Sequence, residues 1–432
     1  MRRQFKKIKP AGRVEGVITL PGDKSISHRA VMIGSIAHGE TRIENFLDAE
    51  DCVATLNAFK KMGLDIRVSG GAVVIRGAGL KGLKKPVSDI YLGNSGTSMR
   101  LLLGILAGQD FESVLTGDDS LNGRPMGRVT VPLRRMGADI RGRDEANFAP
   151  LTVKGARLRG IDYVSPVASA QVKSSILFAG LSAEGVTSVT EPFRSRDHTE
   201  RMLALFGGDI STDGLKVSVR PSDGLVGKNI CIPGDISSAA FFIVAAMLLS
   251  GSEITIRDLG CNGTRTGVID ILRRMGGRIE LGNTREGWEP VCDLTVRSGG
   301  LRATTIEKSE IPRAIDEIPA LMVAAVFAKG RTVIKGAAEL RVKETDRIAS
   351  MLHNLGKMGA SVVCEGDDVI IEGTGTLRGS EELSSFKDHR TAMAVAVAGL
   401  CAASGESVID ETECVNTSFP GFFDIMGSVA VD

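Results

Sequence analysis

A short signature recurs at similar intervals along the whole chain, and this repeat constrains the fold more than any other feature. In each copy, apolar residues precede Met-Gly or Phe-Gly, and a β-branched residue follows three positions after the glycine. The clear copies are Met62-Gly63, Met136-Gly137, Phe206-Gly207, Met275-Gly276 and Met358-Gly359, and we expect a degenerate sixth copy at Met426-Gly427. A fixed period predicts repeated supersecondary units that bury their apolar faces against one another.

A second signature recurs along the chain at intervals similar to those of the first. Runs rich in alanine and leucine end in glycine, and a short strand pattern such as 253–256 or 332–334 follows. These glycines are Gly39, Gly251, Gly330 and Gly405, and less cleanly Gly108 and Gly185. The unit therefore reads as a buried helix, a strand, an amphipathic helix, a Met-Gly turn and one or two closing strands, because two independent patterns agree in order.

The length of 432 residues favours two domains rather than one core. Pro21-Gly22-Asp23 precedes one apolar helical run, and Pro233-Gly234-Asp235 precedes another about halfway along the chain. We therefore predict an α/β fold of two similar three-unit domains with buried helices. The first domain spans 21–234, the second combines 1–20 with 235–432, and the chain crosses between them at hinges near 21 and 233.

Composition excludes several classes of partner. The net charge is +1 and aromatic residues make up 4%, so the chain lacks the basic field and the stacking surface of a nucleic-acid-binding protein. No uninterrupted apolar stretch reaches the roughly 20 residues of a membrane span. Seven scattered cysteines indicate unbridged thiols in a reducing compartment, and neither cysteine nor histidine spacing suggests a structural metal. We expect a cytoplasmic protein that acts as a monomer.

Cations stand at the starts of the apolar helices in the first half, where the helix dipole disfavours them. Lys24, Ser25 and Arg29 open the first helix, and Arg100 ends the glycine-rich opening 93–100 of the next. Ser169, Gln171 and Lys173 open the third, and Arg124 lies between glycine and proline in the loop 117–126. Each segment alone fits an ordinary capped helix or surface turn. Together, backbone N–H groups, hydroxyls and cations predict a site for phosphate or carboxylate groups.

Carboxylates join the cations in the second half. Asp316 precedes the apolar run 320–328, and Arg390 precedes the run 392–402. We expect 341–347 to begin a helix that places Lys343 and Arg347 on one face with Glu344 beside them. A solvated charged helix is the alternative for that segment taken by itself.

Two segments match nucleotide-binding motifs in their residue pattern but not in the structure that each motif requires. Gly77-Ala78-Gly79-Leu80-Lys81-Gly82 fits G-x-G-x-x-G, but the Leu-Lys-Lys-Pro that follows cannot open the required helix. Gly22-Asp23-Lys24-Ser25 lacks the spacing of a P-loop. We therefore expect no nucleotide site.

The segments already described resemble 5-enolpyruvylshikimate-3-phosphate synthases, in order and over nearly the whole chain. The motifs that carry the resemblance are 21–25 with Arg29, 93–97, 123–126, 169–171, 196–200, 341–347 and 388–390. The segment Arg196-Asp197-His198-Thr199-Glu200 is similar to one found in a bacterial subgroup of the family. The resemblance implies two domains of three β-α-β-α-β-β units each. It also implies transfer of the enolpyruvyl group of phosphoenolpyruvate to the 5-hydroxyl of shikimate 3-phosphate, with no metal or organic cofactor. Enzymes of this family belong to aromatic amino acid biosynthesis and are targets of glyphosate.

The resemblance also assigns residues. Shikimate 3-phosphate would be held by Lys24, Ser25, Arg29, Ser169, Gln171, Arg196, Asp316 and Lys343. Phosphoenolpyruvate would be held by Lys24, Asn94, Gly96, Arg124, Gln171, Arg347 and Arg390. Asp316 would act as base toward the hydroxyl and Glu344 as acid toward the methylene carbon, with Lys24 assisting. The sequence departs from some members at Ser418, where they carry a lysine, and at Ala170, where they carry serine.

Two other functions are weighed against this one. The related transfer to a UDP-amino sugar uses a reactive cysteine in the loop that 118–126 occupies here, and that loop contains none. A non-enzymatic repeat scaffold would give no reason for acids beside cations at helix openings.

Overall fold

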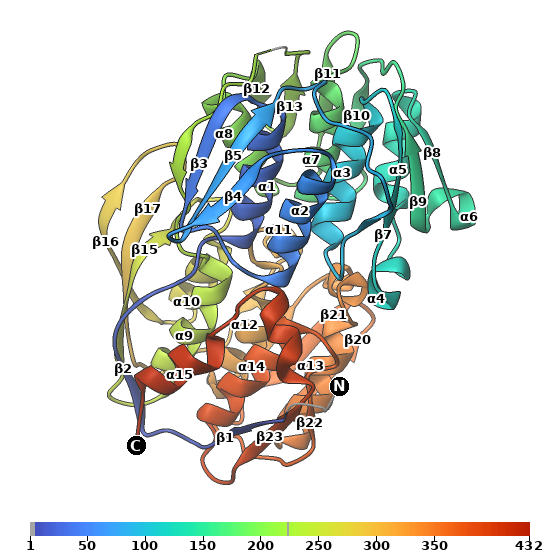
Figure 1. Cartoon of the computed structure of the whole chain (residues 1–432). Helices are drawn as coiled ribbons and strands as arrows, with labels where there is room; N and C mark the ends of the chain where they lie inside the picture. Colours follow the sequence, from blue (N-terminus) through green and yellow to red (C-terminus); the bar gives the residue numbers. More distant parts are fainter. Residues whose placement is uncertain (1–4, 223) are drawn as a thin grey trace. The chain divides into compact units, whose positions relative to one another are not determined.

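The computed structural model describes residues 5–222 and 224–432, and the chain divides into two compact units (Figure 1). We call Gly22–Ile232 the N-terminal unit, and Met1–Pro21 with Pro233–Asp432 the C-terminal unit. The expected boundaries at 21 and 234 lie beside these, and the hinge role of the two crossings stays a prediction.

The N-terminal unit contains three four-stranded sheets of the same design. Their strand orders are β14-β3-β5-β4, β6-β7-β9-β8 and β10-β11-β13-β12. In each sheet the first two strands are parallel, and the third and fourth add on as antiparallel neighbours. The strands are β3 (His38–Glu44), β4 (Ile66–Ser69), β5 (Ala72–Ala78), β6 (Ile90–Tyr91), β7 (Glu112–Thr116), β8 (Asp139–Gly142), β9 (Phe148–Lys154), β10 (Asp162–Val164), β11 (Thr187–Thr190), β12 (Ile210–Asp213), β13 (Lys216–Val219) and β14 (Asn229–Cys231).

The C-terminal unit repeats the design with two variations. Its sheets have the orders β16-β17-β15-β2-β24, β18-β19-β21-β20 and β1-β23-β22. The strands are β1 (Lys6–Ile8), β2 (Arg13–Thr19), β15 (Glu253–Gly260), β16 (Arg278–Arg285), β17 (Val291–Arg297), β18 (Thr305–Ile306), β19 (Arg331–Ile334), β20 (Ser361–Glu365), β21 (Asp368–Glu372), β22 (Leu383–Ser384), β23 (Ser407–Asp410) and β24 (Ala430–Val431). The expected fold class, two similar sets of three α/β units, is confirmed.

The chain passes between the units in the middle of a repeat. Strand β2 directly precedes the first helix of the N-terminal unit, yet it pairs in parallel with β15 of the C-terminal unit. Strand β14 directly precedes a helix of the C-terminal unit, yet it pairs in parallel with β3. Each unit therefore obtains one of its strands from the part of the chain that leads into the other unit.

The Met-Gly turns end the amphipathic helices, as the repeat predicts. Met62, Met136, Phe206, Met275 and Met358 are buried C-caps of α2 (Glu50–Lys61), α5 (Gly127–Arg135), α8 (His198–Leu205), α10 (Gly267–Arg274) and α13 (Arg347–Lys357). The glycines that follow have φ of 87°, 102°, 93°, 96° and 92°. Only glycine adopts this left-handed region without strain, so one residue both stops the helix and turns the chain into its strand.

The sixth copy does not follow the pattern. Gly427 lies inside α15 (Phe422–Val429), and the short strand β24 follows that helix. Strand β1 from the start of the chain pairs antiparallel with β23 instead and completes that sheet. The expectation that Gly39 stops the first helix is also wrong, because Ala37 is already extended and Gly39 lies within β3.

Apolar helices form the core of each unit. They are α1 (Lys24–Ile36), α3 (Gly96–Ala107) and α7 (Ala170–Gly180) in the N-terminal unit, and α9 (Ile236–Leu248), α12 (Ile318–Phe327) and α14 (His389–Leu400) in the C-terminal unit. Every residue of α14 is buried, and α9, α12 and α14 pack against one another (Figure 1). Phe241, Phe242, Phe419 and Phe422 add edge-to-face contacts in that core. The expectation of buried apolar helices is therefore confirmed.

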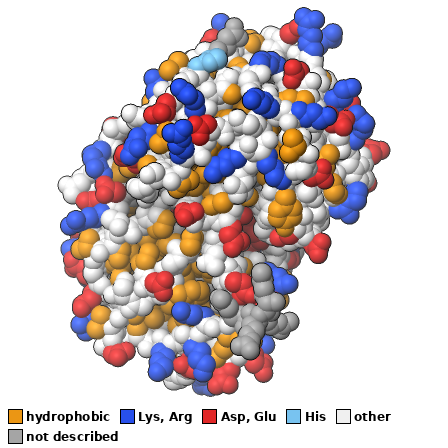
Figure 2. Space-filling model, viewed as in Figure 1, with side chains coloured by type: hydrophobic (Ala, Val, Ile, Leu, Met, Phe, Trp, Pro, Cys, Tyr) orange, Lys and Arg blue, Asp and Glu red, His pale blue; other side chains and the backbone are white. Residues whose placement is uncertain are grey.

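Shorter helices lie between these elements. They are α4 (Asp119–Asn122), α6 (Arg143–Ala146), α11 (Ile311–Ala314) and the 3₁₀ segments η1 (Ala338–Val342) and η2 (Thr412–Thr417). Among the described residues, none of the helices combines the length and hydrophobicity of a membrane span. Acidic and basic side chains are interspersed on the face that Figure 2 shows, which fits the net charge of +1.

Candidate active site

Three capped helix starts hold the polar residues of the N-terminal unit. Asp23 accepts a hydrogen bond from the Ile26 backbone N–H at 2.9 Å and so caps α1. Ser95 and Ser169 cap α3 and α7 in the same way. These caps fix the backbone of the first turns, so the side chains of those turns are held in position.

Arg29, Ser25 and Arg196 come together around the start of α1. The Arg29 guanidinium, which is buried, donates to Ser174 Oγ at 2.8 Å, Thr199 Oγ1 at 2.7 Å and the Ser25 carbonyl at 2.9 Å. Arg196 Nη1 donates to Ser25 Oγ at 3.1 Å. Two cations from distant segments therefore meet at one serine, as an anion site requires.

Lys24 lies beside a carboxylate that the sequence reasoning missed. Its Nζ is 2.8 Å from Asp51 Oδ2, and both side chains are largely buried. Asp51 belongs to the first turn of α2, where an acidic residue is also favoured by the helix dipole. The structure therefore balances Lys24 within the protein and holds its ammonium group at the α1 opening.

Asn94, Gly96, Arg124 and Gln171 form a second group around the start of α3. Arg124 donates to Asn94 Oδ1, and Asn94 Nδ2 donates to Asp118 at 2.8 Å. A Cβ atom at Gly96 would lie 3.2 Å from Arg124 Nη1. The glycine therefore leaves space for the arginine, and the structure brings together the residues that the sequence placed on three segments.

Arg100 links this group to α7. Its Nη1 donates to Gln171 Oε1 at 2.7 Å, and Gln171 Nε2 donates to Thr97 Oγ1 at 2.9 Å. Arg100 stands in the segment 93–100 that the sequence reasoning singled out, but its role was missed. Its position at the end of a glycine-rich helix opening was the available signal.

Arg347 organises the acidic residues of the C-terminal unit. Its buried guanidinium donates to Glu344 at 2.6 Å, to Asp388 at 2.9 Å and to Asp316 at 3.0 Å. Burial alone would lower the pKa of Arg347, but the three carboxylates outweigh burial and raise that pKa above its ordinary value. One cation therefore fixes both carboxylates that the sequence assigns to acid–base chemistry.

The expected helix over 341–347 is wrong. The 3₁₀ segment η1 ends at Val342, and α13 begins only at Arg347, because Asp346 caps that helix by accepting from the Ala349 N–H. Lys343 is extended, so it does not share a helical face with Arg347. Glu344 contacts Arg347 from this irregular segment rather than from a helical turn.

Arg390 has two buried guanidinium nitrogens without a partner among the described residues. It lies in the first turn of α14, where its backbone N–H donates to the N-cap Asp388 at 2.7 Å. Its side-chain Nε and Nη1 are buried and have no hydrogen-bond partner among the described residues. Because an unpaired buried cation is costly, this arginine suits an anion that the protein does not itself supply.

Pro233-Gly234-Asp235, which resembles the start of α1, does not offer a comparable site for an anion. At the start of α9, Arg265 Nη2 lies 3.1 Å from the N-cap Asp235 and 2.7 Å from Ser237 Oγ. Ser237 also donates to Glu317. A buried arginine of the protein therefore occupies this helix opening, which explains why Pro233-Gly234-Asp235 needs no lysine beside it.

Comparison with known proteins decides the family. The sequence profile of EPSP synthase (3-phosphoshikimate 1-carboxyvinyltransferase) matches residues 8–426. The chain belongs to the EPSP synthase family. A 3-phosphoshikimate 1-carboxyvinyltransferase of Geotalea uraniireducens is 56% identical over 98% of this chain and 99% of its own, and one of Pelotomaculum thermopropionicum is 53% identical over 97% of each. The solved EPSP synthase of Acinetobacter baumannii is 48% identical, with a TM-score of 0.87 over 99% of this chain and 98% of its own.

The EPSP synthase family membership confirms the resemblance read from the motifs. It sets aside both a UDP-amino-sugar transferase and a non-enzymatic scaffold.

Proposed function

We propose that two sets of side chains carry out the reaction that membership of the EPSP synthase family assigns to this chain. That reaction transfers the enolpyruvyl group of phosphoenolpyruvate to the 5-hydroxyl of shikimate 3-phosphate and releases phosphate. Each substrate carries one phosphate and one carboxylate, so the site needs several cations.

The convergence of Arg29 and Arg196 on Ser25 is the observation that carries the binding part of the proposal. With Lys24, Ser169 and Gln171, these residues bind shikimate 3-phosphate. Asp316 and Lys343 of the C-terminal unit complete its site and face its hydroxyl groups.

We assign the group of residues around the start of α3 to phosphoenolpyruvate. Lys24, Asn94, Gly96, Arg124 and Gln171 bind it from the N-terminal unit. Arg347 and Arg390 bind it from the C-terminal unit, and the guanidinium of Arg390 obtains from it the hydrogen bonds that it lacks in the described structure.

The reaction needs one base and one acid. Asp316 removes the proton of the 5-hydroxyl, and its oxygen attacks C2 of phosphoenolpyruvate while Glu344 protonates the methylene carbon. The C2–O bond to phosphate in the tetrahedral intermediate then breaks, and the methyl carbon gives a proton back to the Glu344 carboxylate so that the new enol ether forms. The proton taken from the 5-hydroxyl leaves with the released phosphate. Lys24 donates to the leaving phosphate. Arg347 holds both carboxylates, so it fixes the distance between base and acid.

We also propose that the protein works as a monomer in the cytoplasm. The seven cysteines, none in a disulfide among the described residues, fit a reducing compartment.

Phosphate release on mixing the two substrates tests the activity. We expect release that requires both shikimate 3-phosphate and phosphoenolpyruvate, at one phosphate per enolpyruvyl group transferred. Release from phosphoenolpyruvate alone, or no release from both, would overturn the proposal. Asp316→Asn is expected to abolish turnover while shikimate 3-phosphate still binds, because asparagine keeps a hydrogen-bonding side chain but cannot act as a base.

A further inference from the structure

Glu191 connects three segments of the N-terminal unit behind the shikimate 3-phosphate residues. Its Oε1 accepts from the Ser169 backbone N–H at 2.8 Å. Its Oε2 accepts from Ser195 Oγ at 2.8 Å and lies 2.9 Å from Lys173 Nζ. One carboxylate thus ties the N-cap of α7, the second turn of α7 and the residue directly before Arg196.

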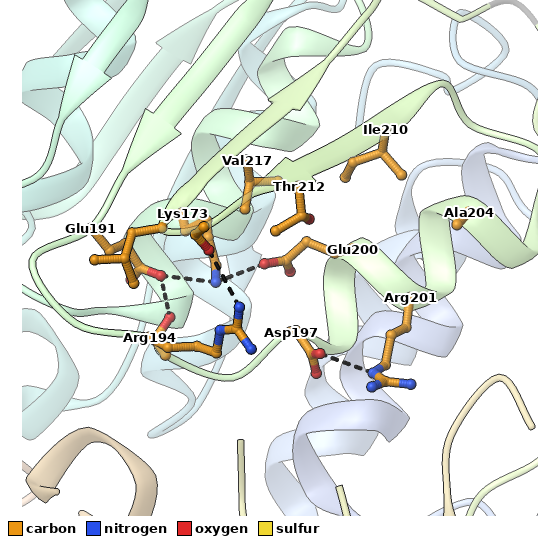
Figure 3. A pocket seen from close by; sticks show the side chains of 13 residues that line it. Lys173, Glu191, Arg194, Asp197, Glu200, Arg201, Ala204, Ile210, Thr212 and Val217 are labelled. Carbon is orange, nitrogen blue, oxygen red and sulfur yellow. Dashed lines mark hydrogen bonds and ion pairs between the residues drawn. The ribbon is translucent and has the colours of Figure 1, made fainter. Parts of the chain in front are cut away.

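Lys173 forms an ion pair with Glu191. Its ammonium group also lies 2.6 Å from Glu200 Oε1, and all three side chains are at least nine-tenths buried. Burial alone would lower the pKa of Lys173, but the two carboxylates outweigh it and raise that pKa, so the lysine stays charged. Figure 3 shows the ammonium group between the two carboxylates.

The second carboxylate has a different environment. Burial raises the pKa of Glu200, and its Oε2 has no hydrogen-bond partner among the described residues. Glu200 lines a pocket of about 310 Å³ together with Lys173 and Glu191 (Figure 3). Apart from its own backbone, the contact that Glu200 makes in this cluster is with Lys173, so it serves as a second counter-ion.

We propose that Glu191 is a positioning residue for shikimate 3-phosphate. It acts at two places through its two oxygens. Oε1 orients the N-cap residue Ser169, and Oε2 holds Ser195 so that the adjacent Arg196 reaches Ser25. This inference rests on the proposed function, because Ser169 and Arg196 are binding residues only if shikimate 3-phosphate binds there.

Glu191→Gln and Glu200→Gln form a matched pair for the test. Each replacement removes one buried carboxylate and leaves Lys173 with the other, so the charge change is identical. The amide of Glu191→Gln can still accept from the Ser169 N–H, but its NH2 group cannot accept from Ser195 or Lys173. Glu200→Gln leaves both connections of Glu191 intact.

We expect Glu191→Gln to raise the dissociation constant of shikimate 3-phosphate by about tenfold, as loss of a hydrogen bond to a charged group predicts. Calorimetric titration measures this directly. The KM for phosphoenolpyruvate at saturating shikimate 3-phosphate is expected to stay within about twofold. Glu191→Gln and Glu200→Gln are expected to lower the melting temperature to a similar extent. Glu200→Gln is expected to change the dissociation constant of shikimate 3-phosphate little.

Ser195→Ala provides an independent variant if Glu191→Gln fails to fold. It removes only the hydroxyl between Glu191 and the segment of Arg196, and we expect it to weaken shikimate 3-phosphate binding by about threefold to tenfold. Equal affinities in Glu191→Gln and Glu200→Gln, or an unchanged affinity in Ser195→Ala, would overturn the positioning role. A wild-type protein that does not bind shikimate 3-phosphate would instead overturn the proposed function itself.

Discussion

Replacing Arg390 with methionine is expected to stabilise the protein and to destroy its activity. The guanidinium Nε and Nη1 are buried without hydrogen-bond partners among the described residues. Leaving a buried polar group unsatisfied costs about 1–3 kcal/mol, and a charged group costs more. Arg390→Met removes two such groups and fills much of the same volume, so we expect the free energy of unfolding to rise by at least about 2 kcal/mol. For a unit of this size the melting temperature should rise by roughly 4–8 °C.

The same change removes the hydrogen bonds that we propose Arg390 gives to phosphoenolpyruvate. Hydrogen bonds to charged groups contribute about 1.5–3 kcal/mol each, so two of them amount to roughly a 10²- to 10⁴-fold loss in kcat/KM for phosphoenolpyruvate. Differential scanning calorimetry without substrate measures the first effect, and steady-state phosphate release measures the second.

Arg265→Met is the matched control in the same unit. Arg265 is equally buried, but its guanidinium pairs with Asp235 and lies 3.8 Å from Glu317. Removing it leaves buried carboxylates without a counter-ion, which costs about 3–5 kcal/mol. The two arginine replacements should therefore shift the melting temperature in opposite directions. If Arg390→Met lowers the melting temperature as Arg265→Met does, or keeps wild-type activity, the reasoning about Arg390 is refuted.

Three further predictions concern the N-terminal unit and the two units together. Lys24→Ala should reduce turnover at least about 10³-fold while the circular dichroism spectrum is retained, because a charged contact to the leaving group is lost; an active variant would reject its role. Burial holds the pKa of His28 well below its ordinary value, so the folded state binds fewer protons than the unfolded state. Stability should fall as pH drops below about 6.5, with His28 contributing up to about 1.4 kcal/mol per pH unit. His28→Gln should remove the contribution of His28 to this pH dependence. If the urea midpoints of His28→Gln vary with pH as those of the unchanged protein do, the prediction is wrong. Small-angle scattering should show a smaller radius of gyration with both anions bound, since we propose that residues of both units bind them; unchanged dimensions would count against closure near 21 and 233.

Local signals explain why much of the fold could be predicted. The turn at Met62-Gly63 and its equivalents needs only the end of a helix and a residue that tolerates positive φ. Both can be recognised in the sequence, from the end of the helical pattern and from the glycine that follows it. Asp23 likewise sits next to the N–H groups that it caps. Such features depend on neighbours in the chain, so one sequence is enough to locate them.

Long-range partners could not be predicted in the same way. Asp51 reaches Lys24 from the next helix, and Arg265 reaches Asp235 from a separate segment. The helix expected over 341–347 failed for a related reason, because charge spacing suggested a helical face while the Asp346 cap delays the helix to Arg347. The family resemblance supplied residues that charge pattern alone left open, such as Arg196.

The position of bound shikimate 3-phosphate tests the central claim most directly. A crystal structure of the complex should place its phosphate and carboxylate within about 3.2 Å of donor atoms of Ser25, Arg29, Ser169 or Arg196. An occupied site elsewhere on the protein, with these four side chains keeping only their contacts within the protein, would contradict the account.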